Sequence, residues 1–247
     1  EPQALLPAGA HDATSRAAAT CARISRTVRA CRSVKTVVLV PYRSDNNGRR
    51  DRSWRYVRQH MERHHDWPIF MGESPEGPFN RAAAINHAAA QCDWGVAVVI
   101  DADTFTPATQ MEHAVKLASE PWRLVAAFTH VIELSRSASD KYLAGKASFG
   151  EGGIRRRDSA LTVQSSALAV HRSLFDRVGG FDDKFVGWSA EDNAFWRACT
   201  LHAGDPLRVD GPVYHLWHRP SRPHYLDENY QRNQKRWQQY LSAHTVD

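Results

Sequence analysis

Short apolar runs alternate with segments of helical spacing in the first part of the chain. The runs at residues 35–42, 68–73 and 94–100 each fit a buried strand. Between them, residues 53–65 carry apolar positions at helical spacing, and residues 79–91 are rich in alanine. Strands that alternate with helices in this way predict an α/β, Rossmann-like fold, with a mostly parallel central sheet and helices on both faces.

The second part of the chain is less regular. The pattern predicts three more strands and three more helices, at 121–134, 161–171 and 211–220 and at 172–181, 189–204 and 228–241 respectively. Ser189 is the expected N-cap of the helix over 189–204. Residues 145–159 are rich in glycine and charge and have no apolar period, which predicts a mobile loop. Residues 1–34 are expected to form a tail or an irregular helix ahead of a single domain over 35–247.

Composition narrows the class of protein. The chain has 247 residues, of which 42% are hydrophobic, so it can bury a sizeable core. No run approaches the roughly 18 apolar residues that a membrane span needs, so no membrane partner is expected. The four cysteines are scattered without a C-x-x-C pair, and the first residues lack a signal pattern. These features predict a reducing, cytoplasmic location.

The charge is positive, with a formal net charge of +5 and a sequence pI of about 9.2. The local clusters of arginine are Arg49, Arg50, Arg52 and Arg55, followed much later by Arg155, Arg156 and Arg157. A solvated basic surface explains them simply. The alternative is a polyanionic partner, either a diphosphate-bearing donor or a nucleic acid.

Two aspartates follow the most hydrophobic strand, in the segment VAVVIDADTF over 96–105. Residues i and i+2 point the same way from an extended chain, so Asp101 and Asp103 can converge on one ligand. Paired carboxylates at a strand end suit Mg²⁺ or Mn²⁺. The simpler alternative is that they cap the next helix, which is expected to begin near Pro107.

Further polar residues lie near the ends of later elements. In YHLWH, over 214–218, His215 and His218 are candidate metal ligands, provided that the chain turns near Trp217. Of the two, His218 is preferred. Glu191 and Asp192 open the helix expected over 189–204, where acids compensate the helix dipole or serve as a general base.

Together these segments resemble the GT-A-fold glycosyltransferases, in particular the β-1,4-galactosyltransferase and polypeptide N-acetylgalactosaminyltransferase relatives. The resemblance covers roughly residues 35–220 and lies in the order and spacing of motifs. These are VVLVPYR, FNRAAAIN, VVIDADTFTP, GGFDDKFVGWSAEDNAFWRA and YHLWHRP. It implies a GT-A fold and a sugar transferase that takes a nucleoside-diphosphate sugar, most simply a UDP-sugar, with Mn²⁺ or Mg²⁺ as cofactor.

The resemblance also implies a role for individual residues. Those expected to bind the nucleotide sugar are Pro41, Tyr42, Arg43, Arg81, Asp101 and Trp188. Asp103, His218 and His215 would hold the metal. Asp192 would act as the base of an inverting reaction, and Glu191 would position the acceptor. Ser165 and Ser166 stand where the galactosyltransferases have two glycines, and Asn193 where a third acid is found, which leaves the donor sugar and the stereochemistry open.

Several alternatives remain at this point. The acceptor is a hydroxyl of a glycan or protein, or of hydroxymethylated DNA in a phage type of DNA modification. A metal-dependent phosphoesterase or nuclease would use similar Asp and His residues. A non-catalytic basic DNA-binding module would explain the arginines alone.

Overall fold

The computed structural model of the protein describes residues 35–158, 164–219 and 227–243. Its core is a six-stranded sheet. From one edge to the other the strands are β2 (Ile69–Gly72), β1 (Thr36–Pro41), β3 (Val96–Ile100), β8 (Ala167–His171), β5 (Leu124–Ala126) and β9 (Leu207–Arg208). Every residue of β3 is buried, as its unbroken apolar run predicts.

The sheet is parallel except around one strand. β1 pairs in parallel with β2 and β3, and β5 pairs in parallel with β9. β8 runs antiparallel to both of its neighbours, β3 and β5. The predicted α/β fold with a mostly parallel sheet is therefore confirmed, with β8 as the reversed strand.

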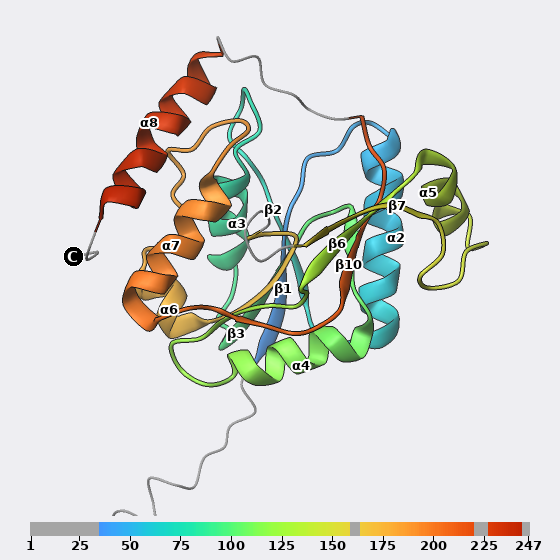
Figure 1. Ribbon diagram of the computed structural model, residues 1–247, viewed down its shortest axis with the longest axis horizontal. Helices are drawn as coiled ribbons and strands as arrows, with labels where there is room; N and C mark the ends of the chain where they lie inside the picture. Colours follow the sequence, from blue (N-terminus) through green and yellow to red (C-terminus); the bar gives the residue numbers. More distant parts are fainter. Residues whose placement is uncertain (1–34, 159–163, 220–226, 244–247) are drawn as a thin grey trace, which may run out of the picture. The chain divides into compact units, whose positions relative to one another are not determined.

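Helices lie on both sides of this sheet. The helices of the described residues are α2 (Arg49–His64), α3 (Arg81–Ala89), α4 (Ala108–Ala118), α5 (Arg136–Leu143), α6 (Arg172–Arg177), α7 (Glu191–Ala203) and α8 (Glu228–Ser242), of which α5 packs on α2 and α8 on α7. Figure 1 shows α2 on one side of β1 and β3, and α3, α6 and α7 on the other. Gly72 allows α3 to approach β2 closely, because a Cβ atom at that position would lie only 1.6 Å from the carbonyl oxygen of Ala84.

A second, four-stranded sheet begins directly after β3 in the sequence. Its order is β4 (Thr104–Phe105), β10 (Pro212–His215), β6 (His130–Leu134) and β7 (Gly153–Asp158). β4 begins directly after Asp103, and β10 pairs antiparallel with it. This pairing brings the chain just after β10 back to the end of β3, where the amide of Leu216 donates to the carbonyl of Asp103 at 2.8 Å.

Three details differ from the sequence prediction. Residues 121–134 form two strands, because the chain leaves the six-stranded sheet after Ala126 and enters the other at His130. Residues 145–159 are not one loop, since 153–158 form β7 against β6. Ser189 does not cap α7: Ala190 takes the N-cap position, and the Ser189 hydroxyl instead accepts from the amide of Gln234 at 2.7 Å.

Other predictions concern parts that the structure describes incompletely. The prediction for residues 1–34, and with it the proposed domain boundary, concerns residues outside the described ones, as do Cys21 and Cys31. Cys92 and Cys199 are free thiols. Among the described residues, no helix has the length and apolarity needed to cross a membrane.

Candidate active site

The two aspartates after β3 turn to different partners. The chain bends there, with the amide of Thr104 donating to the carbonyl of Asp101 at 3.2 Å, so the extended geometry that would align both side chains is lost. Asp101 accepts from Nε of Arg81 at 2.8 Å. Asp103 instead faces His215 and His218. Of the two aspartates, Asp103 is the one that belongs to the cluster with His215 and His218. Convergence of both carboxylates on one metal stays a prediction.

Asp103, His215 and His218 form a compact group of ligand atoms. One atom from each residue lies within 4.8 Å of the others. Nε2 of His215 is 3.8 Å and Nε2 of His218 is 3.7 Å from the Asp103 carboxylate, and the two nitrogens are 3.1 Å apart. β10 ends at His215 and residues 216–219 are irregular, so the i, i+3 spacing does not place the two rings on opposite faces of a strand, and they meet instead.

Glu133 and Arg157 support this group from the second sheet. Glu133 is the register partner of His215 across β6 and β10, and its carboxylate lies 2.8 Å from Nδ1 of that histidine. Arg157, on β7, forms an ion pair with the other carboxylate oxygen of Glu133. Burial favours the neutral acid, but the hydrogen bond from His215 and the charges of His215 and Arg157 outweigh it and lower the pKa of Glu133 to about 2.

Sequence reasoning missed Glu133. It lies in an apolar run that predicts only a strand, and no motif surrounds it. Its place in the site follows from the parallel pairing of β6 with β10, two strands far apart in the chain. The same pairing raises the pKa of His215: burial opposes the charged form, but the hydrogen bond to Glu133 and the charges of Asp103 and Glu133 favour it more strongly.

Arg81 joins the end of β3 to the start of α7. Its guanidinium lies 2.8 Å from Asp101 and 3.8 Å from Glu191. Both terminal nitrogens are buried and face these carboxylates, Nη2 that of Asp101 and Nη1 that of Glu191, although neither completes a hydrogen bond of good geometry among the described residues. Burial and the charge of Asp192 raise the pKa of Glu191 to about 7, although Arg81 opposes the shift. Arg81 thus links the end of β3 to the start of α7. Its role at the diphosphate and those of Glu191 and Asp192 at the acceptor stay predictions.

Asn80 and Asn86 explain why FNRAAAIN has its particular spacing. Asn80 caps α3 through the amide of Ala83 at 2.9 Å, and its own amide donates to the carbonyl of Asp183 at 2.6 Å. Asn86 exchanges two hydrogen bonds with the backbone of Phe181, at 2.7 and 2.9 Å. Both asparagines therefore fix the segment that leads into α7, and so set where Glu191 and Asp192 lie.

The remaining predicted residues lie at the carboxyl end of β1 and before α7. Tyr42 donates to Asp51 at 2.5 Å, and the Arg43 guanidinium donates to the carbonyls of Pro75 and Gly77, both at 2.7 Å. Pro41 is the last residue of β1. Trp188 is 58% exposed and stacks on Tyr230, with ring centroids 6.1 Å apart. The roles of these residues in binding a nucleotide sugar stay predictions.

A sheet of this topology with an Asp–His–His group at the end of β3 is the arrangement expected of a GT-A glycosyltransferase. The family model described as glycosyl transferase family 2 matches residues 24–179. The chain belongs to this family, and the sequence prediction of a glycosyltransferase is confirmed. The competing prediction of a non-catalytic DNA-binding module has no support from the match.

Solved structures of glycosyltransferases share the fold at low sequence identity. The catalytic domain of Drosophila β1,4-galactosyltransferase 7, in complex with xylobiose, is 16% identical, with a TM-score of 0.51 over 82% of this chain and 80% of that one. Glucosyl-3-phosphoglycerate synthase from Mycobacterium tuberculosis, in complex with Mn²⁺, UDP and glucosyl-3-phosphoglycerate, is 14% identical, with a TM-score of 0.51 over 87% and 82%. These likenesses confirm the GT-A fold. No curated protein sequence matches the chain.

Proposed function

We propose that the protein is a metal-dependent enzyme that transfers a sugar from a nucleoside-diphosphate sugar, with a UDP-sugar as the first candidate, to an acceptor hydroxyl. The observation that carries this proposal is the convergence of Asp103, His215 and His218 within 4.8 Å at the end of β3. In α/β sheets of this kind, ligands gather at the carboxyl ends of the parallel strands.

The three side chains fit a divalent cation by their chemistry. One carboxylate and two imidazoles suit Mn²⁺ better than Mg²⁺, which prefers oxygen ligands alone. Glu133 adds to the fit, because a carboxylate on Nδ1 keeps the proton there and leaves Nε2 of His215 free for a metal. A bound cation would offset the negative charge that grows on the diphosphate as it leaves.

Arg81 is the residue best placed to meet the rest of the diphosphate. Its terminal nitrogen Nη2 lies 2.8 Å from Asp101, whereas Nη1 is buried, is 3.8 Å from Glu191 and completes no hydrogen bond among the described residues. A buried charged donor in this state would gain from a hydrogen bond to an incoming phosphate oxygen. Asp101 would hold the guanidinium in place while this happens. Pro41, Tyr42 and Arg43, at the carboxyl end of β1, would line the base and ribose.

The acids of α7 would act on the acceptor. Asp192 would take the proton of the acceptor hydroxyl as the new C–O bond forms, which implies inversion at the sugar carbon. Glu191, held by Arg81, would position the acceptor. Trp188 presents a largely exposed indole next to these acids in the sequence, and it would form one wall of the sugar pocket.

The acceptor is the least defined part of the proposal. The arginines of residues 155–157 were expected in a mobile loop, but they lie on β7, and Arg157 forms an ion pair with Glu133. Arg157 is therefore less available to bind the phosphates of a DNA acceptor. A glycan or protein hydroxyl is therefore proposed ahead of a hydroxymethylated DNA base.

The decisive experiment measures release of nucleoside diphosphate from a panel of nucleotide sugars, with Mn²⁺ and with chelator, in the presence of glycan, peptide and hydroxymethylated oligonucleotide acceptors. We expect release from one class of donor, dependent on metal and abolished in Asp103→Ala. Full activity in excess chelator contradicts a metal-dependent transfer. Hydrolysis of simple phosphodiesters without sugar transfer would support the phosphoesterase alternative instead.

A further inference from the structure

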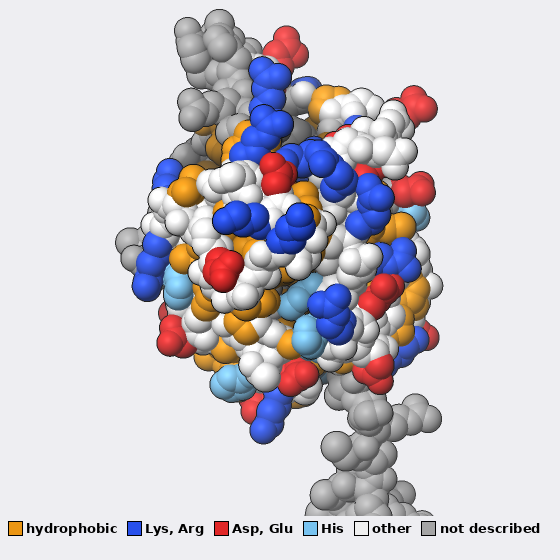
Figure 2. Space-filling model, turned by 90° about the vertical axis from the view of Figure 1, so that its right-hand side faces the viewer, with side chains coloured by type: hydrophobic (Ala, Val, Ile, Leu, Met, Phe, Trp, Pro, Cys, Tyr) orange, Lys and Arg blue, Asp and Glu red, His pale blue; other side chains and the backbone are white. Residues whose placement is uncertain are grey.

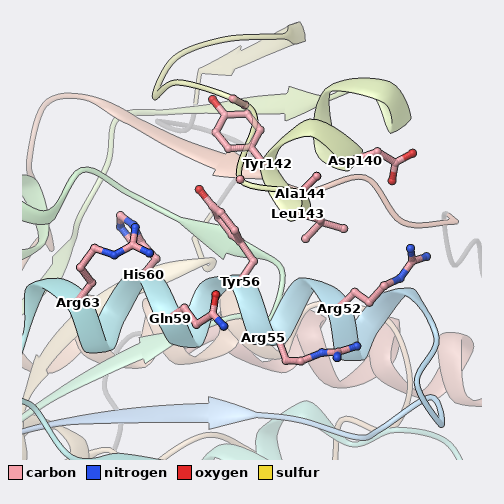
Figure 3. A pocket seen from close by; sticks show the side chains of 12 residues that line it. Arg52, Arg55, Tyr56, Gln59, His60, Arg63, Asp140, Tyr142, Leu143 and Ala144 are labelled. Carbon is pink, nitrogen blue, oxygen red and sulfur yellow. The ribbon is translucent and has the colours of Figure 1, made fainter.

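A cavity of about 660 Å³ lies outside the site described above, between α2 and the segment formed by α5 and the residues that follow it. Figure 3 shows Tyr56 rising from α2 toward Tyr142 across this cavity, with Arg52 and Arg55 toward one end and Arg63 toward the other. The volume is in the range of small-ligand sites, roughly 300–1,000 Å³.

Three arginines line the cavity without a counter-charge. Arg52, Arg55 and Arg63 are exposed, and none forms an ion pair with a carboxylate in the described part of the chain. The acidic residue on the lining, Asp140, is bound by Arg49 at 2.7 Å and is therefore already neutralised. The cavity thus carries an excess of positive charge that the fold itself does not use.

The other walls offer nothing that would repel an anion. Leu143, Ala144 and Ala147 contribute apolar surface opposite α2. Nε2 of His60 lies 2.8 Å from the carbonyl oxygen of Thr106, to which it can donate a hydrogen bond. Burial lowers the pKa of His60, so its ring is neutral near pH 7. Tyr56 packs edge-on against Phe105 and Tyr142, so the floor is fixed by the core.

The spacing of the arginines favours a ligand with several charges. Arg52 and Arg63 are eleven positions apart on one helix, which corresponds to about 16 Å along its axis. A single phosphate ion does not span that length, whereas a chain of phosphate groups does. Figure 2, which shows the side of the molecule that carries α2 and α5, shows Lys and Arg side chains spread widely over the same face.

We propose that this cavity binds a chain of phosphate groups, with Arg52, Arg55 and Arg63 as its anion contacts. The shared chemistry is a row of phosphates, as in the backbone of a single-stranded nucleic acid or in an inorganic oligophosphate. The tyrosine rings serve the core rather than base stacking, so recognition is of the backbone charge and not of sequence. Arg49 connects this cavity to the metal group, because it binds both Asp140 and the carbonyl of Trp217, next to His218.

The test is binding of a short labelled oligodeoxythymidine to the full chain, followed by fluorescence anisotropy in the absence of metal and donor. We expect the triple variant Arg52→Gln/Arg55→Gln/Arg63→Gln to bind at least about tenfold more weakly. Three phosphate contacts also predict a slope of log affinity against log salt of about −2 for the wild type, with a shallower slope for each single variant. Because the side chains are exposed, the melting temperature should stay unchanged, and the single variants give the same answer should the triple variant fail to fold.

Arg58→Gln is the matched control, because Arg58 is on the same helix but is absent from the cavity lining and pairs with Glu62 at 2.8 Å. It should leave affinity within about twofold of the wild type. Equal losses in the control and the cavity variants, or no binding at about 50 mM salt, overturn the proposal. Competition by inorganic tripolyphosphate distinguishes the sources: displacement at similar concentrations indicates an oligophosphate site, and a much weaker effect indicates a nucleic-acid backbone. Neither result depends on sugar transfer.

Discussion

Nδ1 of His215 lies 2.8 Å from a carboxylate oxygen of Glu133, while Nε2 of the same ring faces Asp103 and His218. The carboxylate fixes both the orientation and the tautomer of the ring, and Arg157 fixes the carboxylate in turn. In the proposed metal site Glu133 would therefore be a positioning residue, acting on the metal through His215.

Replacement of Glu133 should weaken metal binding without removing a ligand. We expect Glu133→Ala to lower the Mn²⁺ affinity by about 10–100-fold, the usual cost of losing such an outer partner, measured by calorimetry or by the EPR signal of free Mn²⁺. Glu133→Gln should recover part of the loss, because the amide oxygen still accepts from Nδ1. The exposed Glu120, which pairs with Arg123, provides the control variant Glu120→Gln. Unchanged Mn²⁺ affinity in Glu133→Ala would show that His215 needs no such support.

The two aspartates after β3 should respond differently to substitution. Asp103→Ala removes a proposed metal ligand and should abolish both Mn²⁺ binding and transfer, while far-ultraviolet circular dichroism stays unchanged. Asp101→Asn leaves the metal group intact but loosens Arg81, so it should raise the KM for the donor and retain Mn²⁺ binding. Loss of metal affinity in both variants to the same degree would mean that Asp101 moves to the metal when the ion binds.

Substitution of Asp192 tests the proposed base. Asp192→Asn is nearly isosteric, and the variant should bind donor normally but turn over about 10²–10⁴-fold more slowly, the usual contribution of a general base. Glu191→Gln is the neighbouring comparison and should act mainly on the KM for the acceptor. Steady-state rates with varied donor and acceptor separate the two. A loss of less than tenfold in Asp192→Asn would assign that acid to the start of the helix.

The sheet and the main helices could be predicted from the sequence because they follow simple periodicities. The apolar run of β3 and the alanine-rich α3 were predicted in type and place. The break between β5 and β6 could not be predicted, since residues 122–134 contain no glycine or proline to mark it and the change of sheet depends on pairing with distant strands. β7 was missed for a related reason: its arginines mask any apolar period, and only the backbone of β6 defines it as a strand.

Some residues of the site could likewise be predicted from the sequence, and others could not. The motifs predicted Asp103, His215 and His218 as metal ligands, and the structure brings these three together. Glu133 has no local signal, because only its register opposite His215 makes it part of the site. The separation of Asp101 from Asp103 was also beyond the sequence, because it results from a turn directly after β3 that replaces the extended geometry assumed from i, i+2 spacing.

Glu191 should make the stability of the metal-free protein depend on pH. Its pKa in the folded chain is about 7, compared with an ordinary 4.5, so the folded state binds more protons than the unfolded state between these values. The free energy of unfolding should therefore fall as pH rises through this window, by roughly 1–3 kcal/mol. Urea denaturation at about pH 5 and about pH 7.5 measures the change, and Glu191→Gln should reduce it. An unchanged pH dependence in that variant would show that Glu191 ionises normally.

Ala190 carries backbone strain at the entrance to α7. Its φ of 65° lies in the left-handed region, which costs a residue with a Cβ atom roughly 1–2 kcal/mol and costs glycine almost nothing. Ala190→Gly should therefore stabilise the fold by up to about 1 kcal/mol, once the greater freedom of glycine in the unfolded chain is subtracted. Because Glu191 and Asp192 follow directly, the same change should loosen them and lower the rate of transfer.

The control is Ala203→Gly, at the last residue of α7. This change should destabilise the protein by roughly 0.5–1 kcal/mol, because Ala203 has helical backbone geometry and glycine relieves no strain there. Urea denaturation and initial rates on the two variants test this; if Ala190→Gly destabilises the protein as much as Ala203→Gly does, the strain at Ala190 is refuted.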